Sequence, residues 1–437
     1  MDLYVVRRRL RCLTSAPPRA RFSAHHNNLQ ASISVQAMAT PPSHSPEALL
    51  RAMAPIDKFV DAFTSSLDDN DSCTSWAQPD IGQTQLATLV AKVTTPPFVP
   101  TRRYLRLLLT RYASKVEREA GGQIEDEVLA ELFAEHAFGP SSSISPSPAG
   151  GPATGGGMGG GDAPDPDANG YVSFQLPQDG NGSTYTSSPP DENIVGIRVY
   201  PHHNDVGIRK VWEAGACLAE FLISNPALIR DKKVLELGAG VGLTGIVAAG
   251  LCQAKHLHMT DYTEACLDNM EHNITVNKDW LVRQGVNVDD NEYECSRKLT
   301  SGYLEWTECA EGDNDINGRR EVSTGKPFQI SEAEVLLAAD VVYDASQIPS
   351  LVQSVKLLLS SGGGSGATRD ATKKRKAIFA TTFRNEKTFA LFTNELLNEG
   401  ISCKYVEKEV IASLPNIFPC YFTQPRSDVR ICTMTLG

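Results

Sequence analysis

The chain has 437 residues, a formal net charge of -11 and ten cysteines. This length is enough for two domains with large cores, and the acidic balance disfavours general nucleic-acid binding, which usually requires a basic surface. The cysteines form no C-x-x-C pair and no apolar run reaches the roughly 18 residues that span a bilayer. We therefore expect a soluble monomer without a metal site, whose partners are proteins or small molecules, with no nucleic acid and no membrane.

Residues 1–45 differ in composition from the rest of the chain. Met1 to Thr40 contains six arginines and a single acid, Asp2. This composition resembles an organelle transit peptide. The alternative is a disordered extension, with translation starting at Met38 or Met53. We expect the protein to be cytoplasmic, with organellar targeting by this segment left open.

Residues 46–138 are predicted to form a helical N-terminal region. Apolar residues recur at helical spacing over Pro46 to Leu67, where Pro55 should kink or divide the helix. A second helix should begin after the capping residue Thr101, with an apolar stripe from Tyr104 to Val116. Its arginines lie mostly on other faces, either as a solvated surface or as a contact for an acidic partner or RNA. Residues 139–170 are nearly all Gly, Pro, Ser, Ala and Asp, which indicates a linker.

Residues 171–437 show the alternation of short apolar runs and helical stretches that is typical of a parallel α/β sheet. The runs near Val172 and Val195 should pair ahead of the core. The predicted core strands are Val234–Leu237, His256–Thr260, Tyr303–Trp306, Val335–Ala339, Ala377–Thr382, Ser402–Ile411 and Val429–Leu436. No helical segment separates the last two, which should form an antiparallel pair at the sheet edge. Seven strands with this ending are typical of the Rossmann-like class I methyltransferase fold. Segments 308–326 and 360–376 look like loop insertions.

A glycine-rich run, Gly238-Ala-Gly240-Val-Gly242, follows the first core strand. A helix is expected directly after it, so the glycines lie where ligands bind in open α/β sheets. Glycines let the backbone approach a ligand closely, and free amides at a helix N-terminus can receive its polar groups. The run also satisfies the dinucleotide fingerprint as Gly240-Val-Gly242-Leu-Thr-Gly245, so a nicotinamide dehydrogenase must be weighed against a methyltransferase that uses S-adenosylmethionine.

Three neighbouring residues bear on that choice. Glu236 precedes the glycines, where its carboxylate would suit the positively charged methionine end of S-adenosylmethionine but repel a pyrophosphate. Asp261 ends the next strand and can accept hydrogen bonds from both ribose hydroxyls, which either cofactor possesses. Trp306 ends the following predicted strand, where its ring would flank the adenine or pack in the core. Glu236 therefore favours S-adenosylmethionine.

Four motifs occur in the same order as in the seven-strand protein lysine methyltransferases of family 16. They are Trp212-Glu-Ala, the glycine-rich run, Leu304-Glu-Trp306 and Ala338-Ala-Asp-Val-Val-Tyr343. Two further stretches resemble the elongation factor 2 lysine methyltransferase family: Leu218-Ala-Glu-Phe-Leu-Ile-Ser-Asn-Pro226 and Thr381-Thr-Phe-Arg-Asn385. The resemblance covers Gly207 to Leu436 well and Val93 to Glu131 weakly.

The resemblance implies roles for individual residues. Those that would line the cofactor pocket are Trp212, Gly238, Ala239, Gly240, Trp306 and Ala339, to which the reasoning above adds Glu236 and Asp261. Asp340 and Tyr343 would lie where the methyl group and a substrate lysine meet, with the carboxylate and nearby carbonyls positioning the amine. Alternatively, Asp340 caps the following helix and Tyr343 packs against it. Thr382, Arg384 and Asn385 would line a substrate channel or form a plain loop.

The implied reaction is S-adenosylmethionine-dependent methylation of a protein lysine, with elongation factor 2 as the expected substrate. A neutral lysine amine would attack the methyl group in line. Because the unperturbed pKa of lysine is about 10.4, a partly desolvated channel must favour the neutral form. Alignment should supply most of the acceleration, and we expect no general base. A small-molecule methyltransferase and a non-catalytic binding protein with the same fold remain alternatives.

Overall fold

The computed structural model describes residues 45–67, 74–138, 169–177, 193–288, 296–307, 328, 332–360 and 375–436. The predicted N-terminal extension, nearly all of the predicted linker and most of both predicted insertions lie outside these ranges. Within the described ranges, no helix combines the length and apolar character needed to cross a membrane.

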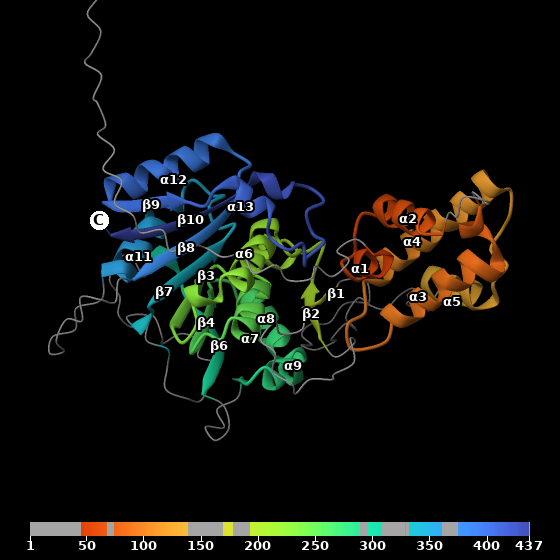
Figure 1. The fold of residues 1–437 in the computed structure, drawn as a ribbon, viewed down its shortest axis with the longest axis horizontal. Helices are drawn as coiled ribbons and strands as arrows, with labels where there is room; N and C mark the ends of the chain where they lie inside the picture. Colours follow the sequence, from red (N-terminus) through yellow and green to blue (C-terminus); the bar gives the residue numbers. More distant parts are fainter. Residues whose placement is uncertain are drawn as a thin grey trace, which may run out of the picture. The chain divides into compact units, whose positions relative to one another are not determined.

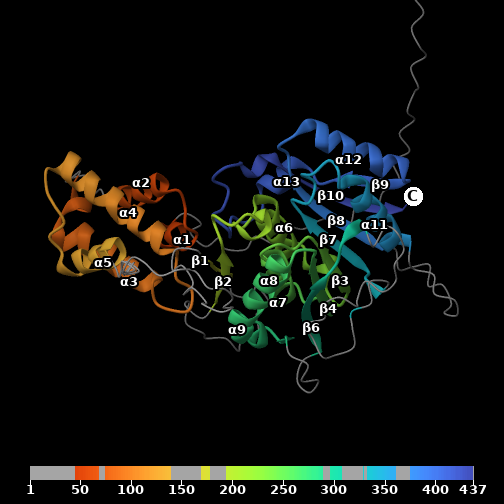
Figure 2. The same cartoon turned by 180° about the vertical axis from the view of Figure 1, so that it is seen from behind.

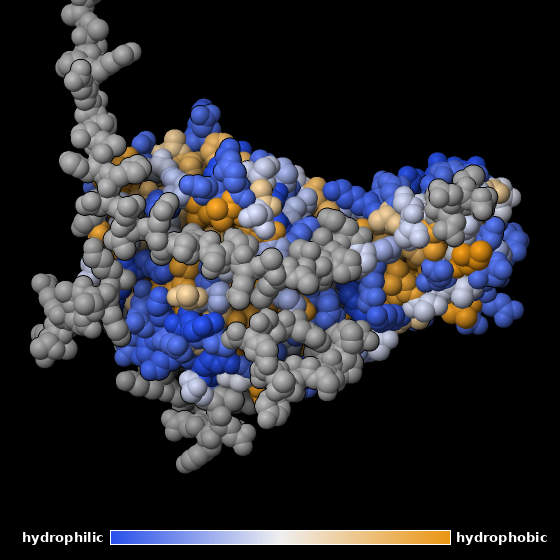
Figure 3. Space-filling view, viewed as in Figure 1, coloured by the Kyte–Doolittle hydropathy of each residue, from blue (hydrophilic) through white to orange (hydrophobic). Residues whose placement is uncertain are grey.

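The N-terminal region is helical, as predicted. Its helices are α1 (Pro46–Arg51), α2 (Ile56–Ser65), α3 (Thr84–Val93), α4 (Arg102–Lys115) and α5 (Glu127–Phe138). Pro55 divides the first predicted helix into α1 and α2. The Thr101 side chain accepts a hydrogen bond from the Tyr104 amide at 3.2 Å, which confirms it as the cap of α4. Buried residues of these helices form a core of their own, while hydrophobic patches also reach the surface over this region (Figure 3).

A two-stranded antiparallel sheet precedes the main sheet, as predicted. It consists of β1 (Gly170–Gln175) and β2 (Ile194–Val199), in which Val172 pairs with Ile197. Asn273 of the helix α8 (Glu264–Val276) and Asn277, the residue after that helix, hold the second strand. The Gly196 amide donates to Asn277 at 3.0 Å and the Arg198 amide to Asn273 at 2.8 Å.

The main sheet has the strand order β5-β6-β4-β3-β7-β8-β10-β9 (Figure 1). Its strands are β3 (Lys233–Leu237), β4 (His256–Asp261), β5 (Val286–Asn287), β6 (Arg297–Tyr303), β7 (Val335–Ala339), β8 (Lys376–Thr382), β9 (Ile401–Tyr405) and β10 (Val429–Leu436). The first six strands in the order are parallel, and β10 runs antiparallel to both β8 and β9. Six of the seven predicted core strands and the antiparallel pair at the edge are therefore confirmed, with the two-residue β5 added beside β6. The predicted strand Tyr303–Trp306 shares only Tyr303 with β6, and a short helix over Lys408–Ala412 separates β9 from β10, where no helical segment was expected.

Helices cover both faces of this sheet (Figure 1, Figure 2). They are α6 (Glu213–Ser224), α7 (Leu243–Leu251), α8 (Glu264–Val276), α9 (Lys278–Arg283), α11 (Ile348–Ser360), α12 (Glu386–Asn398) and α13 (Lys408–Ala412). Alternate residues of each strand enter two separate cores, because side chains of a strand point to opposite faces. Val234 packs with α6 to α9, whereas Leu235 and Leu237 pack with α11 and α12.

Two predicted boundaries are wrong. The strand β6 ends at Tyr303, so Trp306 lies beyond it rather than at its end. The predicted strand over Ser402–Ile411 ends at Tyr405, and Lys408–Ala412 forms the helix α13. Short apolar runs do not distinguish a strand from one turn of helix, which is why these ends were misplaced.

The topology places a ligand site between β3 and β7. From β3 the sheet continues to β4 and β6 on one side, and to β7 and β8 on the other. Ligands of open α/β sheets bind outside the carboxyl ends of the strands at such a reversal of strand order. The segments that follow β3, β4, β7 and β8 are therefore the ones to inspect for chemistry.

Candidate active site

The glycine loop (residues 238–242) follows β3 in a conformation that side chains would strain. Gly238 and Gly240 have φ of 62° and 55°, in the left-handed region that L-residues avoid. A Cβ on Gly238 would lie 2.8 Å from Cγ1 of Val341, and one on Gly240 would lie 2.8 Å from the Gly207 carbonyl oxygen. The loop therefore packs too closely against its neighbours to accept side chains at either position.

Glu236 stands in β3 just before the glycine loop. Its side chain is buried, and its Oε2 atom makes no hydrogen bond within the described part of the chain. Burial raises the pKa of this carboxyl to about 8, although the Thr244 hydroxyl and the Gly245 amide oppose the shift. A buried polar atom without a partner is costly, so this oxygen points to a cationic or hydrogen-bonding ligand.

Asp261 and Trp306 border the same loop. The Asp261 carboxylate accepts a hydrogen bond from the Gly240 amide at 3.0 Å and another from the Tyr262 amide at 2.8 Å. Burial raises its pKa, and these hydrogen bonds oppose the rise. Carboxylate oxygens accept more than one hydrogen bond, so capacity remains for a ligand. The Trp306 ring lies 3.4 Å from where a Cβ on Gly238 would be, although Trp306 is outside the strand.

The N-terminus of α6 completes this edge of the sheet. Gly215, in its first turn, packs against the Ala339 side chain at the end of β7 and against the Thr244 hydroxyl. Trp212 precedes the helix and donates its indole N–H to the Val206 carbonyl at 3.0 Å. All eight residues predicted to bind the cofactor therefore belong to segments at or beside the carboxyl ends of β3, β4, β6 and β7.

Asp340 follows β7 with a left-handed backbone, φ 53°. Its Oδ1 accepts the Thr382 amide at 2.8 Å, and its Oδ2 accepts the Thr382 hydroxyl at 3.0 Å and the Ala214 amide at 3.2 Å. The alternative in which Asp340 caps the following helix is wrong, because Ala214 belongs to α6. The carboxylate instead joins the ends of β7, β8 and α6.

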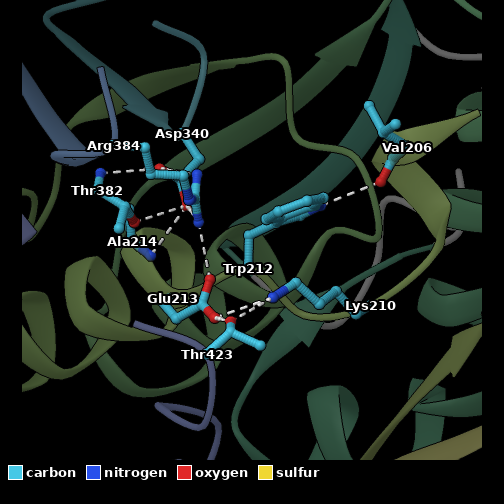
Figure 4. A network of polar contacts seen from close by, with 9 residues as sticks. All are labelled: Val206, Lys210, Trp212, Glu213, Ala214, Asp340, Thr382, Arg384 and Thr423. Atoms are coloured by element: carbon cyan, nitrogen blue, oxygen red, sulfur yellow. Dashed lines mark hydrogen bonds and ion pairs between the residues drawn. The ribbon is translucent and has the colours of Figure 1, made fainter. Parts of the chain in front are cut away.

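Figure 4 shows the network around Glu213, the first residue of α6. Its carboxylate receives Lys210 Nζ at 2.9 Å, the Thr423 hydroxyl, and Arg384 Nη2 at 2.9 Å. Burial raises the pKa of Glu213, but the hydrogen bonds from Thr423 and Lys210 outweigh this and lower it below its ordinary value. The guanidinium also contacts both Asp340 oxygens, at 3.3 and 3.4 Å. Arg384 thus bridges two buried carboxylates.

Two predicted residues remain, Tyr343 and Asn385. Tyr343 is 59% exposed, which leaves part of its side chain open to an incoming substrate. The Asn385 side chain accepts hydrogen bonds from the Lys387 and Thr388 amides and caps α12, which accounts for it without a substrate channel. The catalytic roles of Asp340 and Tyr343 stay predictions.

Comparison with known proteins gives a family. A sequence profile described as lysine methyltransferase matches residues 196–386. Protein N-terminal and lysine N-methyltransferase efm7 from Schizosaccharomyces pombe is 31% identical over 211 residues, which cover 45% of this chain and 71% of that protein. This chain belongs to the lysine methyltransferase family. Protein-lysine N-methyltransferase EEF2KMT from Homo sapiens is 30% identical over 190 residues, 44% of this chain and 50% of that protein.

Protein-lysine N-methyltransferase EFM3 from Chaetomium thermophilum is 27% identical over 195 residues, which cover 44% of this chain and 48% of that protein. The chain thus spans about half the length of EEF2KMT and EFM3. The predicted resemblance is confirmed at the level of the lysine methyltransferase family. Membership of this family also removes the nicotinamide dehydrogenase as an alternative.

The lysine methyltransferase family implies S-adenosylmethionine, and the residues present fit it. The Glu236 oxygen that has no partner within the described part of the chain suits a cationic group. The glycines let the loop backbone come close to a ligand, although the Ala239, Gly240 and Gly242 amides already donate to Thr260, Asp261 and Ala239. Asp261 retains acceptor capacity for hydroxyls. The aromatic rings of Trp212 and Trp306 supply apolar walls on segments that border the loop.

Sequence reasoning did not identify Glu213, Thr244, Gly207 or Thr423 as parts of this edge. Glu213 could have been identified from the sequence, because it is the middle residue of the Trp212-Glu-Ala motif. Thr244 lies within the Gly240–Gly245 fingerprint but was not singled out there. Gly207 and Thr423 carry no local signal, because their place depends on segments that are distant in sequence, such as the contact between Thr423 and Glu213.

Proposed function

We propose that this chain is an S-adenosylmethionine-dependent protein-lysine N-methyltransferase that acts on translation elongation factor 2. One observation carries the proposal: a buried, unpaired carboxylate oxygen on Glu236 precedes a glycine loop at the same sheet edge as Asp340. Family membership supports lysine as the acceptor. The name EEF2KMT and the two stretches outside the pocket that resemble the elongation factor 2 enzymes support the substrate. Action on this substrate would place the protein in the cytoplasm.

The cofactor would be held by both sides of the glycine loop. Glu236 would pair with its positively charged methionine portion, Asp261 would accept from its ribose hydroxyls, and Trp306 would flank its adenine. Trp212 and Ala339 would close the pocket towards the acceptor. When bound, S-adenosylmethionine supplies an electrophilic methyl group, and the lysine nitrogen forms the new C–N bond as the C–S bond breaks with its electron pair leaving on sulfur.

The protein's part in the transfer would be alignment. Asp340 holds the ends of β7, β8 and α6 together through Thr382 and Ala214. This fixes the backbone past which the lysine side chain would enter, next to Tyr343. Holding two reactants in register supplies much of the rate of such a displacement. The incoming amine must lose its proton to solvent before it attacks, because only the neutral nitrogen has a free electron pair.

The test is methyl transfer by the purified full chain. It is incubated with radiolabelled S-adenosylmethionine and either purified elongation factor 2 or a cytosolic extract that lacks this methylation, followed by gel separation and mass spectrometry. Label on a lysine of elongation factor 2 supports the proposal. Label on another protein keeps the reaction and rejects the substrate. Absence of protein label despite measured cofactor binding favours a small-molecule methyltransferase or a non-catalytic protein.

The matched control is Gly238→Val in the same assay. A Cβ at this position would collide with Val341 and lie against Trp306, so the variant should neither bind the cofactor nor transfer label. Label that persists in this variant would reveal a contaminating activity.

A further inference from the structure

The acceptor edge (Asp340, Tyr343, Thr382 and Arg384, with Glu213 and Lys210 behind them) has its charges arranged in two layers. The carboxylates are covered, since the side chains of Glu213 and Asp340 are 0% and 6% exposed. Their cationic partners are not, since the side chains of Arg384 and Lys210 are 33% and 37% exposed. A group that approaches from solvent therefore meets positive charge first.

The carboxylates have few hydrogen-bonding positions left for a substrate. Asp340 already accepts from Thr382, Ala214 and Arg384, and Glu213 from Lys210, Arg384 and Thr423. A substrate ammonium would have to displace these donors to reach either carboxylate. The idea that the Asp340 carboxylate itself positions the amine is therefore less favourable than a role in holding the protein segments.

Arg384 is fixed in the outer layer from several sides. Its guanidinium carbon lies 5.0 Å from the centroid of the Trp212 ring, and Lys210 Nζ lies 4.5 Å from the same centroid. Such cation–π contacts hold a cation over an aromatic face. The close-up shows the guanidinium between Asp340 and Glu213, beside the Trp212 ring (Figure 4). By the family resemblance Trp212 lines the cofactor pocket, which puts this cation next to the reaction.

We propose that Arg384, assisted by Lys210, is a positioning and electrostatic residue that favours the neutral form of the substrate lysine at the acceptor edge. A cation close to an amine disfavours its ammonium form, commonly by about 1 to 3 pKa units at contact distance. This supplies what the edge otherwise lacks, because none of its described residues is an evident general base. The inference rests on the proposed function and adds to it the means by which the acceptor loses its proton.

The charged groups that face Arg384 are Glu213 from α6, Asp340 from the end of β7 and Lys210 ahead of α6. The sulfonium of the cofactor would add a further positive charge. Removal of the guanidinium leaves two buried carboxylates opposed by Lys210 alone, so the local balance turns towards negative. An ammonium would then be favoured, and the amine would deprotonate only at higher pH.

The test is the pH profile of kcat for methylation of elongation factor 2, between about pH 6.5 and 10, by the full chain and its Arg384→Gln and Arg384→Lys variants. The profile of kcat reports the ionisation of groups in the enzyme–substrate complex. We expect Arg384→Gln to raise the apparent pKa by about one unit, to lower kcat about tenfold at pH 7.5, and to approach the wild type at alkaline pH. Arg384→Lys should retain most of the wild-type profile, because it keeps the charge.

Arg426→Gln is the matched control. Arg426 forms an ion pair with the fully buried Glu220 at 2.7 Å. Like Arg384, it is therefore the partner of a buried glutamate of α6, but it makes no contact with Asp340 among the described residues. Its loss should reduce stability without moving the apparent pKa. In Arg384→Gln, Asp340 keeps Thr382 and Ala214 and Glu213 keeps Lys210 and Thr423, so we expect the edge to stay folded.

Three results would overturn the inference. A kcat of Arg384→Gln that falls equally at every pH would make the arginine purely structural. A weaker affinity for S-adenosylmethionine with an unchanged pH profile would make it a cofactor ligand. An unchanged profile with unchanged kcat would remove it from the reaction. Failure of the wild-type chain to methylate any protein would instead reject the proposed function, and with it the inference.

Discussion

The two halves of the candidate site meet at one sheet edge but are built in opposite ways. After β3 and β4, the site is mainly glycine backbone and the Asp261 carboxylate, which the Gly240 and Tyr262 amides hold. It also contains a buried Glu236 oxygen that has no hydrogen-bond partner within the described part of the chain. After β7 and β8, it consists of side chains, and the carboxylates of Glu213 and Asp340 are occupied by protein donors. Buried polar groups are normally paired within a protein. The difference indicates that the first half awaits a ligand, whereas the second half positions segments of the chain.

Gly238→Val should have the largest effect and tests whether the first half of the site binds the cofactor. The residue has φ of 62°, and its Cβ would lie 2.8 Å from Cγ1 of Val341. We expect affinity for S-adenosylmethionine, measured by calorimetry, to fall by about a hundredfold or more. Gly400→Val is the control, because Gly400 has φ of 70° with nothing within 4 Å of its Cβ position. A valine with this left-handed backbone lowers the stability of the fold by about 1–2 kcal/mol, but the variant should keep full affinity for S-adenosylmethionine. Equal affinities for the two variants would reject the placement of the cofactor.

Asp340→Asn tests the second half of the site. An amide NH2 cannot accept the hydrogen bonds that Thr382 and Ala214 now donate, so the ends of β8 and α6 should shift. A displacement of about 1 Å in a site that works by alignment lowers the rate about a hundredfold. We expect that loss in kcat with little change in cofactor affinity. The control is Asp344→Asn, whose exposed carboxylate accepts hydrogen bonds from Ser346 in the same turn, and which should retain activity. A large loss of cofactor affinity in Asp340→Asn would place Asp340 in the first half instead.

Glu236→Gln tests whether the buried carboxyl binds the cofactor, through the pH dependence of cofactor affinity. Because the pKa of Glu236 is raised to about 8, most of the carboxyl is protonated at pH 7. A cationic ligand pairs with the ionised form, so the contribution of Glu236 to binding should release a proton at pH 7 and strengthen as pH rises through 8. Glu236→Gln should bind about tenfold more weakly, since a charged hydrogen bond contributes roughly 1.5–3 kcal/mol.

The measurement is calorimetry in two buffers of different ionisation enthalpy. The cofactor's own amino group titrates near pH 8 whether the wild type or Glu236→Gln binds it. The difference in proton release between the two proteins therefore reports the ionisation of Glu236. Equal proton release from the wild type and the variant would mean that Glu236 does not face the cofactor.

Glu220→Gln should have the smallest effect on activity. Glu220 lies two turns after Glu213 in α6 and accepts from Ile417, Phe418, Tyr421 and Arg426. Loss of one partner of such a buried pair costs about 3–5 kcal/mol of stability. We expect a lower denaturation midpoint with kcat and cofactor affinity unchanged in the folded protein. A selective loss of kcat would show that the whole helix, and not its first turn alone, serves the reaction.

The fold and the first half of the site could be predicted from the sequence because their signals are local. The glycine run after Val234–Leu237 and the strand that ends at Asp261 each occupy a few consecutive residues, and both lie as predicted. Pro55 and Thr101 also identify helix boundaries by their own chemistry.

The second half could not be predicted in the same way because its contacts join distant segments. Glu213 is paired with Arg384 and Thr423, neither of which is near it in sequence. The role expected for the Asp340 carboxylate changed once its donors were visible, since the sequence offers no sign that Ala214 and Thr382 converge on it. Strand ends were misplaced at Trp306, where apolar residues continue beyond β6, and after Tyr405, where Val410 and Ile411 belong to the helix α13.

The close approach of Gly207 to Gly240 limits which sequences can form this pocket. A Cβ on Gly240 would lie 2.8 Å from the Gly207 carbonyl oxygen, and a Cβ on Gly207 would lie 2.7 Å from the sulfur of Cys266. An alanine at either position therefore needs a compensating shift in a different segment of the chain. The signature of the pocket is accordingly longer than its run of glycines, and a search for distant proteins with the same pocket should require a small residue well upstream, ahead of the Trp-Glu-Ala motif.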